Sequence, residues 1–317
     1  MSNAPGLSEA GCRARRRRLW ESVLDTCQWL LIFDPRHVHY LANFWVEPLS
    51  FSFGERAVLL LERDGPAVLA GDNFTIRRAT SDPHVDEQIV ATWYDHRHAV
   101  VNRDAALASA VEQLADRLQN RPGLVEREWL PVALAEVLPV DLNEPQTISL
   151  GDEIRRLRRQ KEPDEVELLR RCMRATEAGH RRALEVAAPG KTEIEVFCEV
   201  QSAAILEAAY AALIYGDFRA TNADRPKAGG LPTTYQLQEG DLFLLDYTVM
   251  LAGYRSDFTN AVAVGTPTEE QSATIRSNTC SSPRRTTTSS FLPTRGKSTG
   301  RKFTTCRNSP ATAGDEP

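Results

Sequence analysis

Two aspartates stand within one apolar stretch, "LFLLDYTVMLAGYRSDFTN", which runs from residue 242 to residue 260. Asp246 ends a run of apolar residues, and Asp257 follows eleven residues later. Both halves are rich in β-forming residues and "LAG" separates them, so the stretch predicts a β-hairpin. If Leu251 and Ala252 form its tip, Asp246 faces Asp257 across the two strands, with both side chains on one face of the hairpin.

This pairing of Asp246 with Asp257 would need compensation. Like charges directly opposite each other destabilise a sheet, and partial burial adds the loss of hydration. One carboxyl could stay protonated and form an acid/base dyad, or cations could lie between the two. Two-metal hydrolases use carboxylates in this way to hold ions about 3.5–4 Å apart and to activate water. Oxygen ligands suit Mn²⁺, Co²⁺ or Zn²⁺. The alternative is two ordinary aspartates that are solvated or bonded to the backbone.

Three segments of the chain resemble one protein family in the same order. "EGDLFLLDYTVMLAGYRSDFTNAVAVG" resembles the metal-site hairpin of the pita-bread metallopeptidases, which include Xaa-Pro aminopeptidases, prolidases, methionine aminopeptidases and creatinases. "QKEPDEVELLRR" resembles the opening helix of their catalytic domain, and "LIFDPRHVHYLANF" resembles a signature of the creatinase-type N-terminal domain. The hairpin positions that match the family pattern are Gly240, Asp241, Asp246, Gly253, Tyr254, Asp257 and Thr259.

The resemblance implies an α/β N-terminal domain of ribonuclease-H-like, creatinase type, followed by an α+β pita-bread catalytic domain. We place the N-terminal domain at 14–145, a linker and the start of a long helix at 146–163, and a partial catalytic domain at 164–271. The implied function is a metal-dependent Xaa-Pro peptidase that acts on a peptide or small amide substrate, usually as a homodimer. Asp246 and Asp257 would be metal ligands, with Mn, Co or Zn as the two divalent ions.

The chain also departs from the family pattern. That pattern has five ligands, and after the two aspartates come a His and two Glu residues. None of the six histidines of this chain follows Asp257, and the segment before the hairpin, "RPKAGGLPTTYQ", lacks the Pro-His of many peptidase members. We therefore expect a truncated catalytic domain that is inactive as given. The alternatives are a creatinase-like or lyase-like relative that acts on a small non-peptide, and a non-catalytic dimerisation or binding remnant.

Composition changes sharply near residue 271. Of the 46 residues from 272 to 317, 18 are Ser or Thr and two are aliphatic, with no helical or strand period. Such a segment buries too little apolar surface to offset its ordering entropy. We predict a disordered tail at 272–317, which an out-of-frame translation would also explain.

Bulk properties bound the partners of the protein. The net charge of −5 argues against nucleic acid, and no apolar run reaches the roughly 18 residues that span a bilayer. Six well-separated cysteines are typical of free thiols in a reducing cytoplasm. The basic run from Arg13 to Arg18 predicts a solvated helix face, with a local anion patch as the alternative. His180 is interpreted as a packed or surface histidine of a helix.

Overall fold

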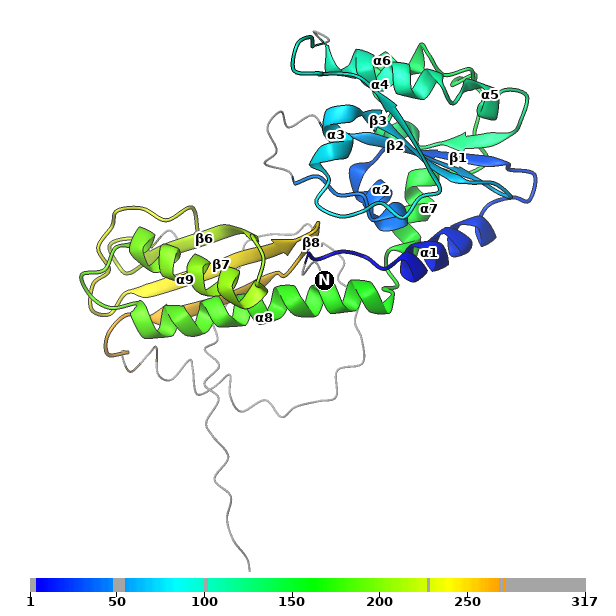
Figure 1. Ribbon diagram of the computed structural model, residues 1–317. Helices are drawn as coiled ribbons and strands as arrows, with labels where there is room; N and C mark the ends of the chain where they lie inside the picture. The colour runs from blue at the N-terminus through cyan, green and yellow to red at the C-terminus, as the bar shows by residue number, and fades with distance from the viewer. Residues whose placement is uncertain are drawn as a thin grey trace, which may run out of the picture. The chain divides into compact units, whose positions relative to one another are not determined.

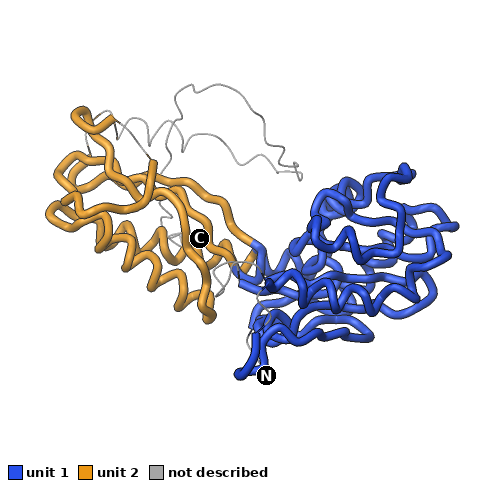
Figure 2. Tube along the Cα trace, turned by 90° about the horizontal axis from the view of Figure 1, so that it is seen from above, with its two compact units in different colours: residues 1–169, 251–254 blue, residues 170–250, 255–317 orange. Residues whose placement is uncertain are grey.

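A computed structural model of the protein describes residues 4–47, 55–99, 102–226, 229–267, 269 and 271. The predicted tail at 272–317 lies outside these residues. The chain divides into two compact units, which Figure 2 colours separately. Unit 1 comprises residues 1–169 and 251–254, and unit 2 comprises residues 170–250 and 255–317.

Unit 1 is built on a five-stranded mixed sheet with the strand order β4-β3-β2-β1-β5 (Figure 1). Antiparallel pairing joins β1 to β2 and β2 to β3, and a turn over residues 63–66 connects β2 with β3. By contrast, β5 runs parallel to β1 and β4 runs parallel to β3. The strand bounds are β1 Trp29–Ile32, β2 Ala57–Glu62, β3 Ala67–Asp72, β4 Glu87–Ala91 and β5 Gly123–Val125.

Helices cover both faces of this sheet, because β1 and β2 are buried on both sides and alternate residues feed two apolar cores. One core includes Leu30 and Ile32, and the other includes Trp29 and Leu31. The helical elements of unit 1 are α1 Glu9–Glu21, α2 Pro35–Ala42, α3 Asn73–Arg78, α4 Arg103–Glu112, α5 Ala115–Leu118, the 3₁₀ turn η1 Arg127–Trp129, α6 Val132–Ala135 and α7 Leu150–Leu157.

Local sequence signals fix where several of these helices begin. Asn102 caps α4 by accepting the amide of Asp104, and Asp34 caps α2 by accepting the amide of Arg36. The apolar sequence from 128 to 137 could suggest one helix, but Pro131 separates η1 from α6. Proline has no amide hydrogen and disfavours helical geometry in the preceding residue. No helix in the described part of the chain is long and apolar enough to cross a membrane.

Unit 2 packs two helices against one face of a four-stranded sheet (Figure 1). The helices are α8 Pro163–Val186, whose first seven residues fall in unit 1, and α9 Glu193–Ala208. Thr192 and Glu195 form a capping box that begins α9. In the sheet, β7 Leu242–Leu251 lies between β6 Leu213–Thr221 and the return strand of the hairpin, which consists of β8 Tyr254–Arg255 and β9 Phe258–Ala263.

The hairpin forms as predicted, but its register differs. The turn lies on Ala252 and Gly253, which both have positive φ, at 44° and 74°. Two central residues with positive φ are typical of the type I′ turn that matches strand twist, and glycine adopts this geometry without strain. Asp246 therefore pairs with Thr259, and the predicted pairing of Asp246 with Asp257 is wrong.

Candidate metal site on the hairpin

Both aspartates nevertheless lie on the same face of the sheet. Ser256 contacts Thr176 of α8 through a 2.6 Å hydrogen bond, and the ring of Phe258 packs against His180 of the same helix. Side chains alternate along a strand, so Asp257 and Thr259 point away from α8. Tyr247 points toward α8, since its hydroxyl donates to the carbonyl of Thr176 at 2.7 Å, and Asp246 therefore also points away from the helix.

The shifted register makes the two aspartates diagonal neighbours. The pair of Ser256 with Val249 continues the register of Asp246 with Thr259, so the residue opposite Asp257 is Thr248. Diagonal positions on one face lie about 7–8 Å apart, against about 4.5–5.5 Å for direct partners. This spacing relieves the repulsion that direct pairing would cause and still leaves both carboxylates within reach of shared cations.

The immediate partners of these carboxylates are few. Asp246 is half-buried and accepts a 2.6 Å hydrogen bond from the hydroxyl of Thr259, whereas Asp257 is exposed. Among the described residues neither aspartate forms an ion pair with a lysine, arginine or histidine. Oxygen donors that no protein cation neutralises are the chemistry that a hard divalent ion requires. The donor set therefore fits a metal, although two carboxylates supply fewer than the six or so ligands that such ions take.

Sequence analysis missed a third acid on this face. Asp217 of β6 pairs directly with Asp246 and accepts a 2.8 Å hydrogen bond from the amide of Gly230. No motif marks Asp217. The one signal in the sequence is its place in "LIYGDFRAT", where Phe218 and Ala220 are buried and Asp217 falls on the alternate, polar face.

Gly240 and Asp241, which precede β7, have a structural role. Gly240 has φ 86°, a left-handed conformation that favours glycine. Asp241 is buried and accepts hydrogen bonds from the amide of Gln238 at 2.9 Å and from the side chain of Asn222 at 2.6 Å. These bonds close the turn that starts β7.

His180 is a packed histidine, in agreement with its interpretation from the sequence. It is 7% exposed, lies between the rings of Tyr247 and Phe258, and makes no hydrogen bond through either ring nitrogen to a described residue. Burial lowers the pKa of its imidazole to about 4. It faces the helix side of the sheet and takes no part in the aspartate face.

A second group of metal-capable side chains lies in unit 1. Asp34, His37 and Glu126 are buried, and they are the one such group of three found among the described residues with ligand atoms within 4.8 Å of one another. Glu126 bonds His37 through one oxygen and the amides of Phe33 and Asp34 through the other. Both oxygens of Asp34 bond the guanidinium of Arg36 at 2.6–3.1 Å. A cation would have to displace Arg36, so we interpret this group as an ion-pair network that ties β1 to β5.

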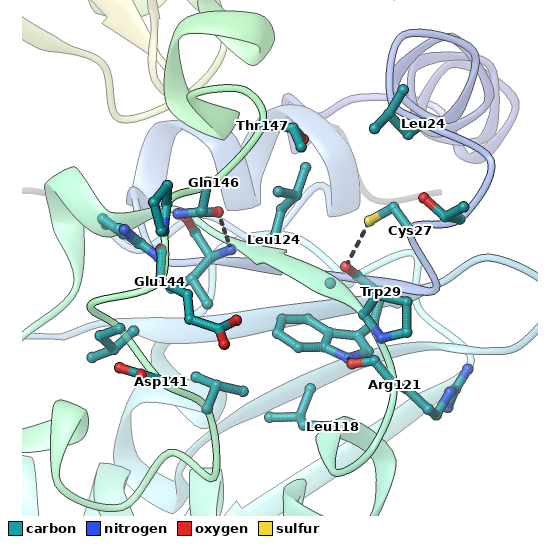
Figure 3. A pocket seen from close by; sticks show the side chains of 18 of the residues that line it. Leu24, Cys27, Trp29, Leu118, Arg121, Leu124, Asp141, Glu144, Gln146 and Thr147 are labelled. Carbon is teal, nitrogen blue, oxygen red and sulfur yellow. Dashed lines mark hydrogen bonds between the residues drawn. The ribbon is translucent and has the colours of Figure 1, made fainter.

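Unit 1 also contains a cavity of about 450 Å³ beside β5 (Figure 3). Its lining includes neither Asp246 nor Asp257. Residues from three segments, 24–29, 118–127 and 139–147, line it. The side-chain amide of Gln146 bonds both the amide and the carbonyl of Val125 at 2.9 Å, as a neighbouring strand would. The thiol of Cys27 lines the cavity and donates to the carbonyl of Trp29 at 3.3 Å, and the described lining residues include no histidine or lysine.

Comparison with known families agrees with this arrangement. The profile of metallopeptidase family M24 matches residues 167–277, which contain the hairpin and both aspartates. The profile of the creatinase/prolidase N-terminal domain matches residues 21–160. Together the two profiles cover most of the chain. The chain therefore combines a creatinase-type N-terminal domain with a region that matches metallopeptidase family M24.

Individual relatives add detail. Over 119 residues the chain is 32% identical to the probable dipeptidase PepE of Mycobacterium tuberculosis and to that of Mycobacterium bovis. The aligned residues make up 37% of this chain and 31% of each relative. The match thus spans less than a third of the length of these curated relatives.

Solved structures share the fold. An Xaa-Pro dipeptidase from Bacillus anthracis aligns with a TM-score of 0.57 at 18% identity, over 84% of this chain and 68% of that one. An X-Pro aminopeptidase from Thermotoga maritima aligns with a TM-score of 0.58 at 15% identity, over 83% and 69%. The dipeptidase PepE of Mycobacterium ulcerans aligns with a TM-score of 0.55 at 20% identity, over 85% and 69%. The predicted fold class, an α/β domain of creatinase type followed by an α+β pita-bread domain, is confirmed.

Proposed function

We propose that the protein is a metal-dependent hydrolase of the Xaa-Pro dipeptidase or aminopeptidase type, with Asp246 and Asp257 as ligands of a divalent metal centre. The observation that carries the proposal is the placement of both carboxylates on the face of the hairpin that points away from α8, within the family-matched region. Among the described residues neither carboxylate forms an ion pair with a basic side chain. Bound metal would lower the pKa of a water molecule and polarise the scissile amide carbonyl.

The residues of the chain would act by orientation. Thr259 donates to one oxygen of Asp246 at 2.6 Å, which fixes that carboxylate and leaves its second oxygen for a ligand. Asp217, the direct partner of Asp246 on β6, adds negative charge to the face and would favour a cationic ligand. The dinuclear character of the centre, Mn²⁺ as its metal, a homodimeric state and a cytoplasmic location remain parts of this proposal.

The experiment pairs metal analysis with turnover. The purified protein is dialysed against Mn²⁺, Co²⁺ or Zn²⁺, its metal content is measured, and hydrolysis of an Xaa-Pro dipeptide is followed. We expect bound metal that Asp246→Asn and Asp257→Asn each reduce, while Asp224→Asn, an exposed acid of the loop after β6, leaves it unchanged. Equal metal content in all four proteins would refute the assignment of the ligands.

A second candidate is a creatinase-like or lyase-like activity on a small non-peptide. The observation that favours it lies in the segment between β6 and β7. The sequence of this segment contains no histidine, and Gly229 and Gly230 within it have positive φ. Metal binding without hydrolysis of Xaa-Pro peptides would support this candidate. The absence of both metal and turnover would favour a non-catalytic binding or dimerisation protein.

A further inference from the structure

The turn of the hairpin is partly buried, although turns ordinarily lie at the surface. Residues 251–254 belong to unit 1, and Leu251 and Ala252 are each 1% exposed. A buried turn must satisfy its polar groups within the protein. Glu165, His39 and Trp45 of unit 1 contact this turn.

Polar contacts hold the turn through Tyr254. Its hydroxyl donates to Oε1 of Glu165 at 2.8 Å, and Glu165 is 1% exposed. The fully buried guanidinium of Arg15 lies 3.6 Å from Oε2 of Glu165 and bonds both oxygens of Asp164 at 2.8 and 3.1 Å. Burial and the adjacent carboxylate of Glu165 raise the pKa of Tyr254, which keeps its hydroxyl protonated as a donor.

Ring contacts enclose the turn on its other side. His39 lies edge-on to Tyr254 with ring centroids 5.9 Å apart, and it also packs against Trp45 at 5.3 Å. A Cβ atom at Gly253 would come within 2.8 Å of the ring of Trp45. The enclosure therefore favours glycine at residue 253 and fits the tyrosine ring at residue 254.

The geometry points to Tyr254 as a positioning residue that fixes the register of the β7–β9 hairpin, and with it the separation of Asp246 and Asp257. Moving the turn by one residue, to Leu251 and Ala252, would make the two aspartates direct partners. It would also carry Tyr254 two residues along β7, about 7 Å, out of reach of Glu165. The role of the aspartates as metal ligands rests on the proposed function, whereas the register does not.

The test is Tyr254→Phe, which removes the hydroxyl and keeps the ring against His39. The register places the amide of Ser256 on the carbonyl of Val249 at 3.1 Å and the amide of Val249 on the hydroxyl of Ser256 at 2.9 Å. We expect these two amides to exchange with deuterium about tenfold faster in the variant, in line with the loss of one hydrogen bond to a charged group. Mn²⁺ affinity measured by calorimetry should fall by a similar factor.

Two further variants make the result decisive. Tyr215→Phe is the matched control, because Tyr215 lies on β6 and is 65% exposed. Glu165→Leu, which removes the acceptor of the Tyr254 hydroxyl, should reproduce the effect of Tyr254→Phe, and the double variant should add little to either single change. Exchange at Val249 and Ser256 equal to that of the control would overturn the inference. So would an equal acceleration of amides throughout both units, which indicates a general loss of stability.

The exchange and metal measurements separate the two proposals. If the unmodified protein binds no Mn²⁺ and the two amides still respond to Tyr254→Phe, the metal assignment fails and the register assignment stands. If Mn²⁺ binds, and the substitution changes neither the exchange rates of the two amides nor the Mn²⁺ affinity, only the register assignment fails.

Discussion

Acidification should destabilise unit 2 through His180. The pKa of this imidazole is about 4 in the folded protein and about 6.5 in an unfolded chain, so folding favours the neutral form. The resulting stability is complete above pH 6.5 and is lost as the pH falls toward 4. The full difference corresponds to about 3 kcal/mol, and about 2 kcal/mol of it is lost by pH 5.

The assay compares the protein with His180→Leu, whose side chain is similar in volume and cannot be protonated. All five tryptophans lie at or before residue 129, so circular dichroism at 222 nm, which reports α8 and α9, is the suitable probe of urea unfolding. Between pH 8 and pH 5 the stability of the variant relative to the parent should rise by about 2 kcal/mol.

A matched control addresses the other histidines. His39, whose pKa burial and nearby Arg15 lower to about 3, gives both proteins the same additional pH dependence, which cancels in the difference. His98→Gln, at a histidine whose side chain is 83% exposed, is the matched control. Parallel stability curves for the parent and His180→Leu would refute the reasoning.

Three further substitutions test stabilising interactions within each of the two units. Glu193→Ala removes a buried carboxylate that accepts hydrogen bonds from two backbone amides and a hydroxyl, and should lower the free energy of unfolding in urea by about 3 kcal/mol. Glu199→Ala, at an exposed position, should lower it by under about 1 kcal/mol. Similar losses for both variants would contradict this prediction. Thr192→Ala should cost about 1 kcal/mol by loss of the α9 cap, visible as lower thermal stability, and an unchanged melting temperature would count against the cap. Arg15→Met leaves Asp164 without its buried cation and should lower the free energy of unfolding, followed by tryptophan fluorescence, by about 3–5 kcal/mol. A loss under about 1 kcal/mol would show that the ion pair is not needed for stability.

Much of the fold is predictable because local signals and apolar patterning agree. The strands around residues 29–32 and 57–72, the capping box of α9 and the hairpin of the two aspartates all follow from residue type and spacing. The register of that hairpin does not, because Leu251–Ala252 and Ala252–Gly253 are both plausible turns in the sequence. The enclosure by Trp45 and the bond from Tyr254 decide between them, and both are long-range contacts.

The basic run of α1 shows a similar limit. A solvated face was expected from Arg13 to Arg18, and Arg13 is indeed exposed. Arg15 is fully buried and Arg16 is 8% exposed, so the prediction is wrong for these two residues. Arg15 is offset by Asp164, which is 149 positions away in the chain, and no local pattern could show this partner. Asp217 was missed for the same reason, since strand pairing brings it to Asp246.

The side-chain amide of Gln146 bears on self-association of this protein. The three-residue strand β5 is one of the two edge strands of the unit 1 sheet, and another polypeptide can pair with the free backbone groups of an edge strand. Gln146 occupies both bonding groups of Val125 and so shields that template with a single side chain. A chain that lost this shield would gain a self-association edge and would be more prone to precipitate, even if its folded stability were unchanged.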